Sequence, residues 1–265
     1  MPFATLGDLE FYWERAGSGP PLLFISGTGG DLRNRPGVFQ GPLPGRFDVL
    51  AYDQRGMGRS AKPSIRYTMA DYGDDAAALM GEIGWDDALV IGVSFGGMVA
   101  QELVLRHPAR VRRLVLACTS PGGAGGASFP FHEIADLTGE ARARYLIPIT
   151  DTRRDDAWAQ SNPAAMQELV LLGSADPYAD EPGHAEGAAR QLQARAAHDT
   201  WDRLVQIRCP VLIAAGSYDG IALPETQRRM AARIPGSQLR FFDGGHLFTL
   251  QDPAALPAIM DFLSA

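Results

Sequence analysis

Residues 90–100 read VIGVSFGGMVA, a serine between glycines with an apolar run before it and an apolar-rich segment after it. The run before Ser94 is typical of a buried strand, and the segment after it is typical of a helix. A strand followed at once by a helix requires a sharp turn at Ser94. In such a turn, side chains at positions 92 and 96 would collide with the neighbouring strand and helix, and glycine avoids the collision because it has no side chain. The stretch therefore predicts a strand, a tight turn and a helix, with the Ser94 hydroxyl presented at the turn.

Apolar runs of strand length recur along the chain, between segments with helical patterns. The predicted strands are residues 21–26, 47–52, 88–92, 111–117, 210–215 and 238–242, and the predicted helices are 68–83, 95–106, 224–233 and 253–263. Residues 3–16 indicate a small antiparallel hairpin at the sheet edge. Near-continuous apolar runs suit strands that are covered on both faces. The alternation predicts an α/β fold, with a mostly parallel eight-stranded sheet and helices on both faces.

Residues 120–208 interrupt this alternation. The segment begins SPGGAGGAS and continues as amphipathic helical patterns broken by proline and glycine, with no convincing strand. An insertion of this size into an α/β sheet predicts a helical lid over the site. Its glycine-rich start is compatible with a hinge or with a plain linker. We therefore predict a core in two parts, residues 1–119 and 209–265, separated by a lid or cap at 120–208.

The composition of the chain argues against some classes of binding partner. The 265 residues are 46% hydrophobic and 21% charged, with a net charge of −7 and no cluster of Lys and Arg, so a nucleic-acid partner is not expected. No apolar stretch approaches the roughly 18 residues that a bilayer-spanning helix needs, and the start lacks the pattern of a secretory signal. These features predict a cytoplasmic protein without a membrane partner. The sequence leaves the oligomeric state open, and a homodimer is one of the states considered.

The two cysteines, Cys118 and Cys209, each lie in or beside an apolar run. A reducing compartment disfavours disulfides, so two buried free thiols are expected. Two thiols without a histidine beside them do not make a zinc site, and we predict no metal.

A serine hydroxyl is a weak nucleophile unless a base accepts its proton. The candidate base is His246, in the FFDGGH stretch at 241–246, because it follows the last predicted strand and two glycines free the backbone before it. His107 ends a predicted helix, and the remaining histidines lie in the insertion. We expect those to be surface or structural residues, with His132 the one considered for a pocket wall.

The base in turn needs a carboxylate to hold its tautomer. Asp219 is the candidate because it follows the predicted strand 210–215, in AGSYDG. Asp243 is nearer to His246 in sequence, but it is interpreted as a turn residue at the end of its strand. The alternative to a catalytic role for Ser94, His246 and Asp219 is that Ser94 is an ordinary turn residue.

An oxyanion on the reacting carbonyl needs two backbone N–H donors. Phe95, directly after the serine, is one candidate. Thr28, in the SGTGGD loop at 26–31, is the other. The alternatives for this glycine cluster are a flexible turn or a phosphate cradle, but it lacks both the GK[ST] ending and the full GxGxxG spacing.

The chain resembles the α/β-hydrolase superfamily from Phe3 to Leu263. The matching segments are SGTGGD, YDQRGMGRS, GVSFGG, GSYDGIALPE and GGH, and the order Ser94, Asp219, His246 is the one expected of that fold. GGMVAQELVLRHPARVRRLVL is similar to small bacterial esterases and lactonases of the 3-oxoadipate enol-lactonase type. Dehalogenases and epoxide hydrolases of the superfamily carry aspartate at the elbow, so Ser94 argues against both.

The resemblance also has departures. Many relatives begin the oxyanion loop with His-Gly, whereas this chain has Ser26-Gly27, so the hydrogen bonding of the loop must differ. In the YDQRGMGRS segment, Asp53, Arg55 and Ser60 are interpreted as loop scaffolding rather than catalytic groups.

The resemblance implies a serine hydrolase that cleaves a small or medium carboxylic ester or lactone through an acyl-enzyme, with no metal or organic cofactor. Phe131 and Trp158 are the predicted substrate contacts. Other aromatic and apolar insertion residues are equally compatible with a lid core, and Arg153 and Arg154 are compatible with a substrate carboxylate or a solvated face. Three alternatives remain: a carbon–carbon bond hydrolase, a cofactor-free perhydrolase or haloperoxidase, and a non-enzymatic small-molecule receptor.

Overall fold

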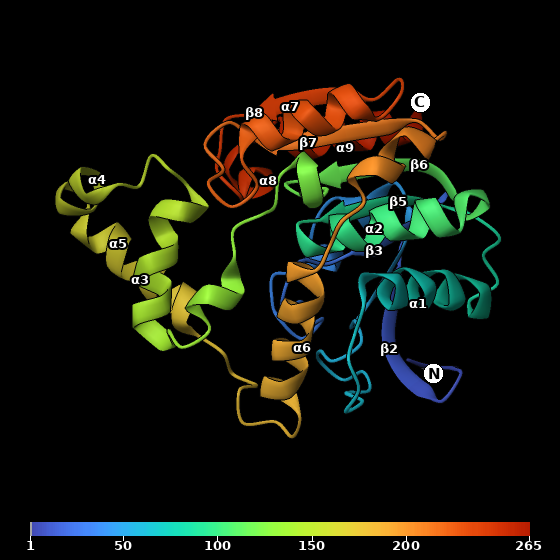
Figure 1. Ribbon diagram of the computed structural model, residues 1–265, viewed down its shortest axis with the longest axis horizontal. Helices are drawn as coiled ribbons and strands as arrows, with labels where there is room; N and C mark the ends of the chain where they lie inside the picture. The colour runs from blue at the N-terminus through green and yellow to red at the C-terminus, as the bar shows by residue number, and fades with distance from the viewer. Residues whose placement is uncertain (1) are drawn as a thin grey trace.

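The computed structural model describes residues 2–265, and an eight-stranded sheet runs through it (Figure 1). Its strand order is β1-β2-β4-β3-β5-β6-β7-β8. The strands are β1 (Phe3–Leu6), β2 (Leu9–Ala16), β3 (Pro21–Ile25), β4 (Asp48–Tyr52), β5 (Ala88–Val93), β6 (Val111–Ala117), β7 (Val211–Gly216) and β8 (Gln238–Phe242). The hairpin β1–β2 is antiparallel, β2 joins β4 in the antiparallel sense, and the other pairs are parallel. The predicted sheet is confirmed, and the carboxyl ends of β3, β5, β7 and β8 lie at one edge.

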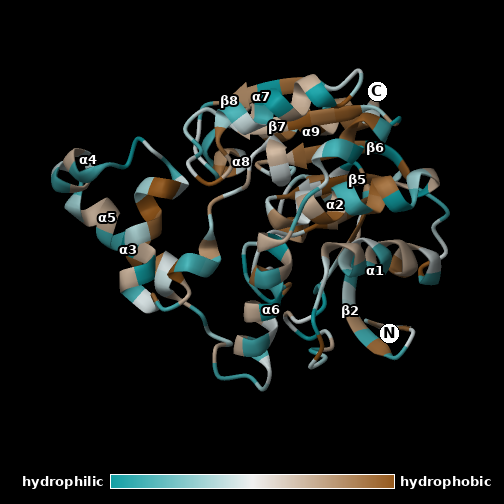
Figure 2. Cartoon of the chain, viewed as in Figure 1, coloured by the Kyte–Doolittle hydropathy of each residue, from teal (hydrophilic) through white to brown (hydrophobic). Residues whose placement is uncertain are grey.

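Helices cover both faces of the sheet. They are α1 (Met69–Glu82), α2 (Phe95–Arg106), α7 (Pro224–Arg233), α8 (Phe248–Gln251) and α9 (Ala255–Ser264). On one face, α1, α2 and α7 pack against strand residues such as Val90, which lies opposite Leu23 on β3 and Leu114 on β6. On the other face, α8 and α9 pack against the alternate residues of the same strands. Strands β6 and β7 are coloured hydrophobic between these layers (Figure 2), as expected of strands buried on both sides.

Local sequence sets where α1 begins and ends. The Thr68 hydroxyl accepts a hydrogen bond from the Asp71 amide at 3.2 Å, and the Asp71 carboxylate accepts one from the Thr68 amide at 2.8 Å. This reciprocal pair satisfies two amides that have no partner inside the helix. Gly84, with φ +81°, follows the last turn, in a conformation that favours glycine.

The insertion contains α3 (Gly139–Thr150), α4 (Asp156–Ser161), α5 (Pro163–Ser174) and α6 (His184–Ala196). Short 3-10 turns occur at Val38–Gln40, Leu43–Gly45, Pro108–Arg110, Gly123–Gly125, Phe131–Ile134 and Trp201–Gln206. Between β6 and β7 the described chain forms isolated β-bridges but no strand. Helix α6 lies beside the core, whereas α3, α4 and α5 form a group at one side (Figure 1). Within residues 2–265, no helix is both long enough and apolar enough to cross a bilayer.

Candidate active site

Ser94 occupies the turn between β5 and α2. Its backbone has φ 55° and ψ −115°, a conformation that is uncommon for a residue with a side chain. A Cβ on Gly92 would lie 2.4 Å from the Gly96 carbonyl oxygen, and one on Gly96 would lie 2.1 Å from the Ile25 carbonyl oxygen. Both glycines are therefore required by close backbone packing, as the sequence predicts. The Ser94 amide donates to the Ala117 carbonyl at 2.8 Å, which ties the turn to β6.

Three side chains from distant parts of the chain meet at this turn. The Ser94 Oγ lies 2.9 Å from His246 Nε2, and His246 Nδ1 lies 2.8 Å from Asp219 Oδ2. The second oxygen of Asp219 accepts from the amides of Ile221 and Ala222, at 2.8 and 2.9 Å. Two backbone donors and the imidazole thus hold this carboxylate in one orientation.

Asp243, the other carboxylate considered for His246, faces a different group. It accepts a hydrogen bond from Arg153 Nη1 at 2.7 Å, and its amide donates to Asp252 at 2.8 Å. It therefore closes the turn after β8, in agreement with its interpretation as a turn residue. The carboxylate bonded to His246 is that of Asp219.

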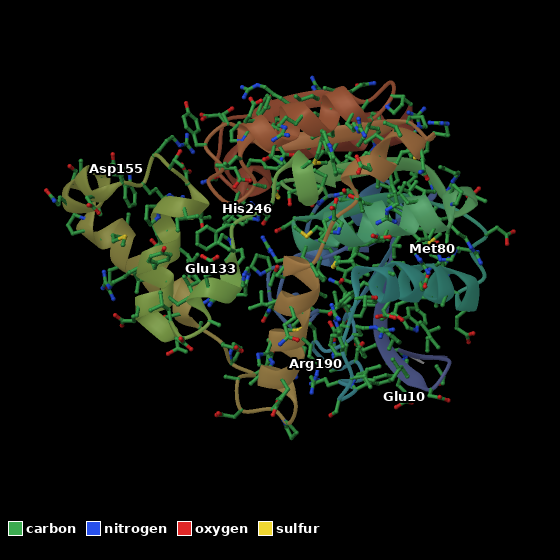
Figure 3. The ribbon with its side chains drawn as sticks, in the orientation of Figure 1. Glu10, Met80, Glu133, Asp155, Arg190 and His246 are labelled. Atoms are coloured by element: carbon green, nitrogen blue, oxygen red, sulfur yellow. The ribbon has the colours of Figure 1, made fainter. Side chains whose placement is uncertain are left out.

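The C-terminal end of α3 braces the loops that carry Asp219 and His246. The His246 amide donates to the Thr150 carbonyl at 2.7 Å, and the Gly220 amide donates to the Ile149 carbonyl at 3.0 Å. A Cβ on Gly245 would lie 2.2 Å from the Thr150 carbonyl oxygen, so this glycine permits the close approach. Figure 3 shows His246 on the side of the core that faces the α3 group. No local pattern in the sequence indicated this brace.

The two predicted oxyanion donors lie on adjacent loops. Phe95 is the first residue of α2, where an amide has no carbonyl one turn earlier to bind. In the SGTGGD loop, the Cβ position of Gly27 is 3.5 Å from the Ser94 Cβ, so the loop passes directly beside the serine. Thr28 follows Gly27 in that loop. Its amide stays a predicted donor.

Helix α6 holds the SGTGGD loop from the insertion side, through contacts that the sequence analysis missed. The Gly29 amide donates to Gln191 Oε1 at 2.8 Å, and the Thr28 hydroxyl accepts from Arg195 Nη1 at 2.7 Å. Gln191 and Arg195 are one turn apart on α6, so both face the loop. Because more than 150 residues separate the partners in sequence, no local pattern could have identified them.

Ser26, at the start of this loop, is bound by Gln54. The Gln54 side-chain amide donates to the Ser26 carbonyl at 2.9 Å and lies 3.3 Å from the Ser26 hydroxyl. The segment after β4 thus holds the start of this loop.

The YDQRGMGRS segment is scaffolding, as predicted. Asp53 accepts from the amides of Leu32 and Arg59, at 2.7 and 2.9 Å. Arg55 forms a buried two-pronged ion pair with Asp75. Ser60 accepts from the Tyr12 amide at 2.9 Å.

The predicted substrate contacts lie in different surroundings. Phe131 is half-buried and lines a cavity beside α6, and His132 lines the same cavity. Trp158 is on α4 in the outer group, and its ring lies 5.9 Å from the Arg154 guanidinium. Both contacts stay predictions. Of the other insertion residues considered, Met166 packs on the small cluster inside that outer group.

Both cysteines are free thiols, as predicted. Cys118 is buried, and burial raises the pKa of its thiol well above the usual value. Cys209 is partly exposed rather than buried, because it lies in the turn before β7, and desolvation raises the pKa of its thiol to about 11. Among residues 2–265, no group of three or more His, Cys, Asp and Glu side chains is arranged to hold a metal ion.

A family model described as the alpha/beta hydrolase fold matches residues 20–253. The chain belongs to the α/β hydrolase fold family. This α/β hydrolase is 31% identical to a protein of Caulobacter sp. (strain K31) that carries the provisional name carbamate hydrolase RutD, over 92% of this chain and 90% of that one. It is 27% identical to 3-oxoadipate enol-lactonase 2 of Acinetobacter baylyi, over 96% of this chain and 89% of that one.

The crystal structure of the enol-lactonase from Burkholderia xenovorans LB400 has a TM-score of 0.81 to this α/β hydrolase. The two are 25% identical, with 100% of both chains covered. The predicted fold and the predicted resemblance are therefore confirmed. Family and relatives together support hydrolase activity as the general function.

Proposed function

We propose that this α/β hydrolase cleaves a carboxylic ester or lactone through an acyl-enzyme formed on Ser94. The observation that carries the proposal is the continuous hydrogen-bonded chain from Ser94 Oγ through His246 to Asp219, at 2.9 and 2.8 Å. This is the arrangement in which an imidazole accepts a hydroxyl proton while a carboxylate holds its other nitrogen. Ser94 and Asp219 are only 7% and 1% exposed, so water competes little for these hydrogen bonds.

In the first half of the proposed reaction, His246 Nε2 takes the proton of Ser94 as Oγ attacks the carbonyl carbon. The negative charge that develops on the carbonyl oxygen is stabilised by the amides of Phe95 and Thr28. When the tetrahedral intermediate collapses, His246 gives the proton to the leaving oxygen. Asp219 stays ionised and holds the imidazole in the productive tautomer.

In the second half, His246 takes a proton from water as the water oxygen attacks the acyl carbon of the Ser94 ester. Collapse of that intermediate returns the proton to Ser94 Oγ and releases the carboxylic acid. The proposed steps use only groups of the chain itself. In a lactone, the leaving alcohol or enol remains attached to the acid, so one molecule is released.

The names of two relatives support acyl substrates of this kind. One is named as an enol-lactonase and another, provisionally, as a carbamate hydrolase. A carbamate differs from an ester by a nitrogen on the carbonyl carbon, and the same attack and oxyanion stabilisation apply to it. Carbamates are therefore the second candidate substrate class.

The decisive test combines labelling and turnover. A fluorophosphonate probe should label the wild-type protein and the Ser161→Ala control, whose serine is exposed on α4, but not Ser94→Ala. On a panel of esters, lactones and carbamates of graded acyl size, Ser94→Ala and His246→Ala should each lose about 10⁴-fold or more in turnover. Equal labelling of Ser94→Ala and wild type would rule out the proposal.

A further inference from the structure

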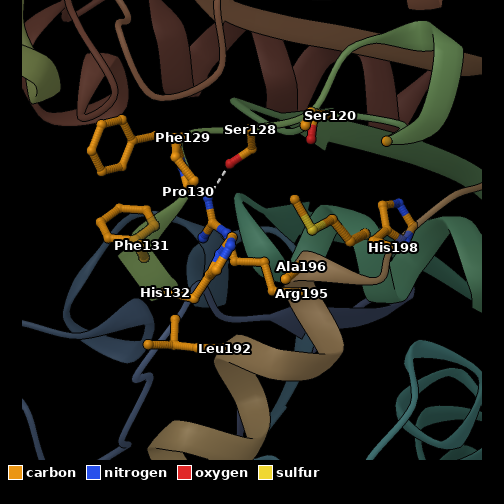
Figure 4. Close-up of a pocket in the computed structure, with 13 residues that line it drawn as sticks. Ser120, Ser128, Phe129, Pro130, Phe131, His132, Leu192, Arg195, Ala196 and His198 are labelled. Atoms are coloured by element: carbon orange, nitrogen blue, oxygen red, sulfur yellow. Dashed lines mark hydrogen bonds between the residues drawn. The ribbon is translucent and has the colours of Figure 1, made fainter. Parts of the chain in front are cut away.

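A cavity of about 70 Å³ lies between the segment that follows β6 and the last turn of α6. Its walls include Met98, one turn along α2 from Ser94, and Ser120, next to the Thr119 hydroxyl that donates to the Ser94 carbonyl at 2.7 Å. Figure 4 shows Arg195 extending toward Ser128 and His198 on another side of the cavity, below Ser120. Ser94 itself is not in the wall, so the cavity adjoins the reacting centre without containing it.

Arg195 is a buried cation without a counter-ion. It is 7% exposed, and its guanidinium donates to the hydroxyls of Thr28 and Ser128, which are both neutral. Its Cζ lies 4.5 Å from the centre of the Phe131 ring. Among residues 2–265, no carboxylate lies within 4.0 Å of this guanidinium, and none of the cavity walls is acidic.

Two arginines elsewhere in the chain show the usual pairing. Arg55 pairs with Asp75, and Arg203 pairs with Glu102. Burial lowers the pKa of Arg195 to about 10, although the charge of Asp219, which is too distant to form an ion pair, acts to raise it. The guanidinium is therefore still charged at neutral pH. A buried charge without a counter-ion is costly, and an anion that enters the cavity relieves that cost.

Two more polar side chains face the same cavity without good partners. His198 is 5% exposed and Ser120 is fully buried. In the described structure, the Ser120 hydroxyl and both His198 ring nitrogens lack a well-formed hydrogen bond, although the Ser120 backbone lies near the ring. Burial, with the charges of Arg203 and Arg195, lowers the pKa of His198 to about 3. The ring is therefore neutral and offers one N–H donor.

We propose that this cavity binds a carboxylate group carried by the substrate, with Arg195 as its counter-ion and with His198 and Ser120 as further hydrogen-bond donors. The guanidinium has five N–H groups, of which two bind Thr28 and Ser128, and the other three have no hydrogen-bond partner in the described structure. The inference rests on the proposed function and specifies its substrate as an ester or lactone that bears a second, ionised acid group.

The position of Arg195 sets which kinetic constant should change. A carboxylate remote from the reacting carbonyl is bound in the ground state and in the transition state alike, so its loss should raise KM more than it lowers kcat. If Arg195 served only to position the Thr28 loop, its loss would lower kcat for every ester. The two roles therefore give different results on matched substrates.

The test uses mono-4-nitrophenyl esters of adipic, pimelic and suberic acids, each beside the ester in which a primary amide replaces the free carboxylate. Wild type should favour the carboxylate ester of the best-fitting pair by about 10-fold or more in kcat/KM. In Arg195→Met, kcat/KM for that ester should fall by about 100-fold, mainly through KM. For its amide partner, kcat/KM should fall by only about threefold to tenfold, the loss expected from removing the hydrogen bond to Thr28. Arg190→Met, on the same helix, should behave as wild type.

Two further variants guard against misfolding and against a purely structural role. Arg195→Gln keeps amide donors for the hydroxyls without the charge and should lose the carboxylate preference, while Arg195→Lys should keep part of it. Equal losses on both esters of a pair, or no preference in wild type, would overturn the inference while leaving ester hydrolysis intact.

Binding measured without turnover separates failure of the inference from failure of the proposed function. In calorimetry with Ser94→Ala, the free dicarboxylate of the preferred length should bind, its diamide should not, and Arg195→Met in the same background should abolish binding. Binding of the dicarboxylate by a protein that hydrolyses none of the esters would reject the proposed function and keep the carboxylate site. Hydrolysis of the esters by a protein that binds the dicarboxylate and the diamide equally would keep the proposed function and reject the carboxylate site.

Discussion

The insertion contains two regions that are attached to the core in different ways. Helix α6 packs directly on it: a Cβ on Gly187 would lie 2.0 Å from the Gly56 carbonyl oxygen, and Gln191 and Arg195 bind the loop at 26–31. Helices α3, α4 and α5 instead surround a small cluster of their own. That group leaves Leu171 and Leu172 of α5 exposed, at 59% and 69%.

The difference shows that one insertion serves the site in two ways. Helix α6 is a wall of the site, because its side chains reach the loop beside Ser94. The outer group reaches the loops that carry Asp219 and His246 through the end of α3, where the carbonyls of Ile149 and Thr150 accept from Gly220 and His246. A small cluster with exposed apolar residues has less burial to stabilise it. We therefore expect the outer group to open more readily than α6.

The largest effect should come from separating the end of α3 from the His246 loop. In Gly245→Ala the new methyl group would meet the Thr150 carbonyl at 2.2 Å, and the backbone must shift. Displacement of a catalytic base by about 1 Å can cost roughly 100-fold, so kcat/KM on the best ester should fall by about that factor. Gly45→Ala, at a glycine with open space around it, is the control. Unchanged turnover in Gly245→Ala would mean that the brace has no functional role.

A smaller effect should appear in the outer group alone. Ile147→Ala removes a buried side chain from the cluster of Ala143, Ile147 and Val170, at a cost of about 2 kcal/mol. Amide hydrogen exchange in α3 and α5 should become about 30-fold faster, while α6 and the sheet keep their rates. Leu172→Ala, at an exposed position of α5, should leave exchange close to that of wild type. An equal increase in α6 would show that the insertion opens as one unit.

The smallest effect should come from α6. Gln191→Ala removes the acceptor of the Gly29 amide and loosens the loop that carries Thr28. Loss of one such hydrogen bond should lower kcat by roughly threefold to tenfold, with folding stability little changed. Gln193→Ala, at an exposed position of the same helix, is the matched control. If both variants turn over esters like wild type, α6 does not position the loop.

The sequence by itself determined the sheet, the turn at Ser94 and the candidates His246 and Asp219. These follow from short-range rules: apolar runs of strand length, glycines at positions that exclude a side chain, and polar residues just after parallel strands. Because those strands end at one edge of the sheet, residues that follow them meet there whatever their separation in sequence. The predicted Ser94, His246 and Asp219 side chains accordingly lie within hydrogen-bonding distance of each other.

Only the tertiary structure decided how the insertion meets the core. Arg153 and Arg195 are both arginines of the insertion, and Arg153 has Asp151 two residues before it in the sequence. Packing pairs Arg153 with Asp151 and Asp243, but buries Arg195 against two hydroxyls without a counter-ion. The pairing of Arg153 with Asp243 and the burial of Arg195 both depend on contacts between residues far apart in the chain. Patterns of neighbouring residues carry no information about such contacts, and the folded arrangement does.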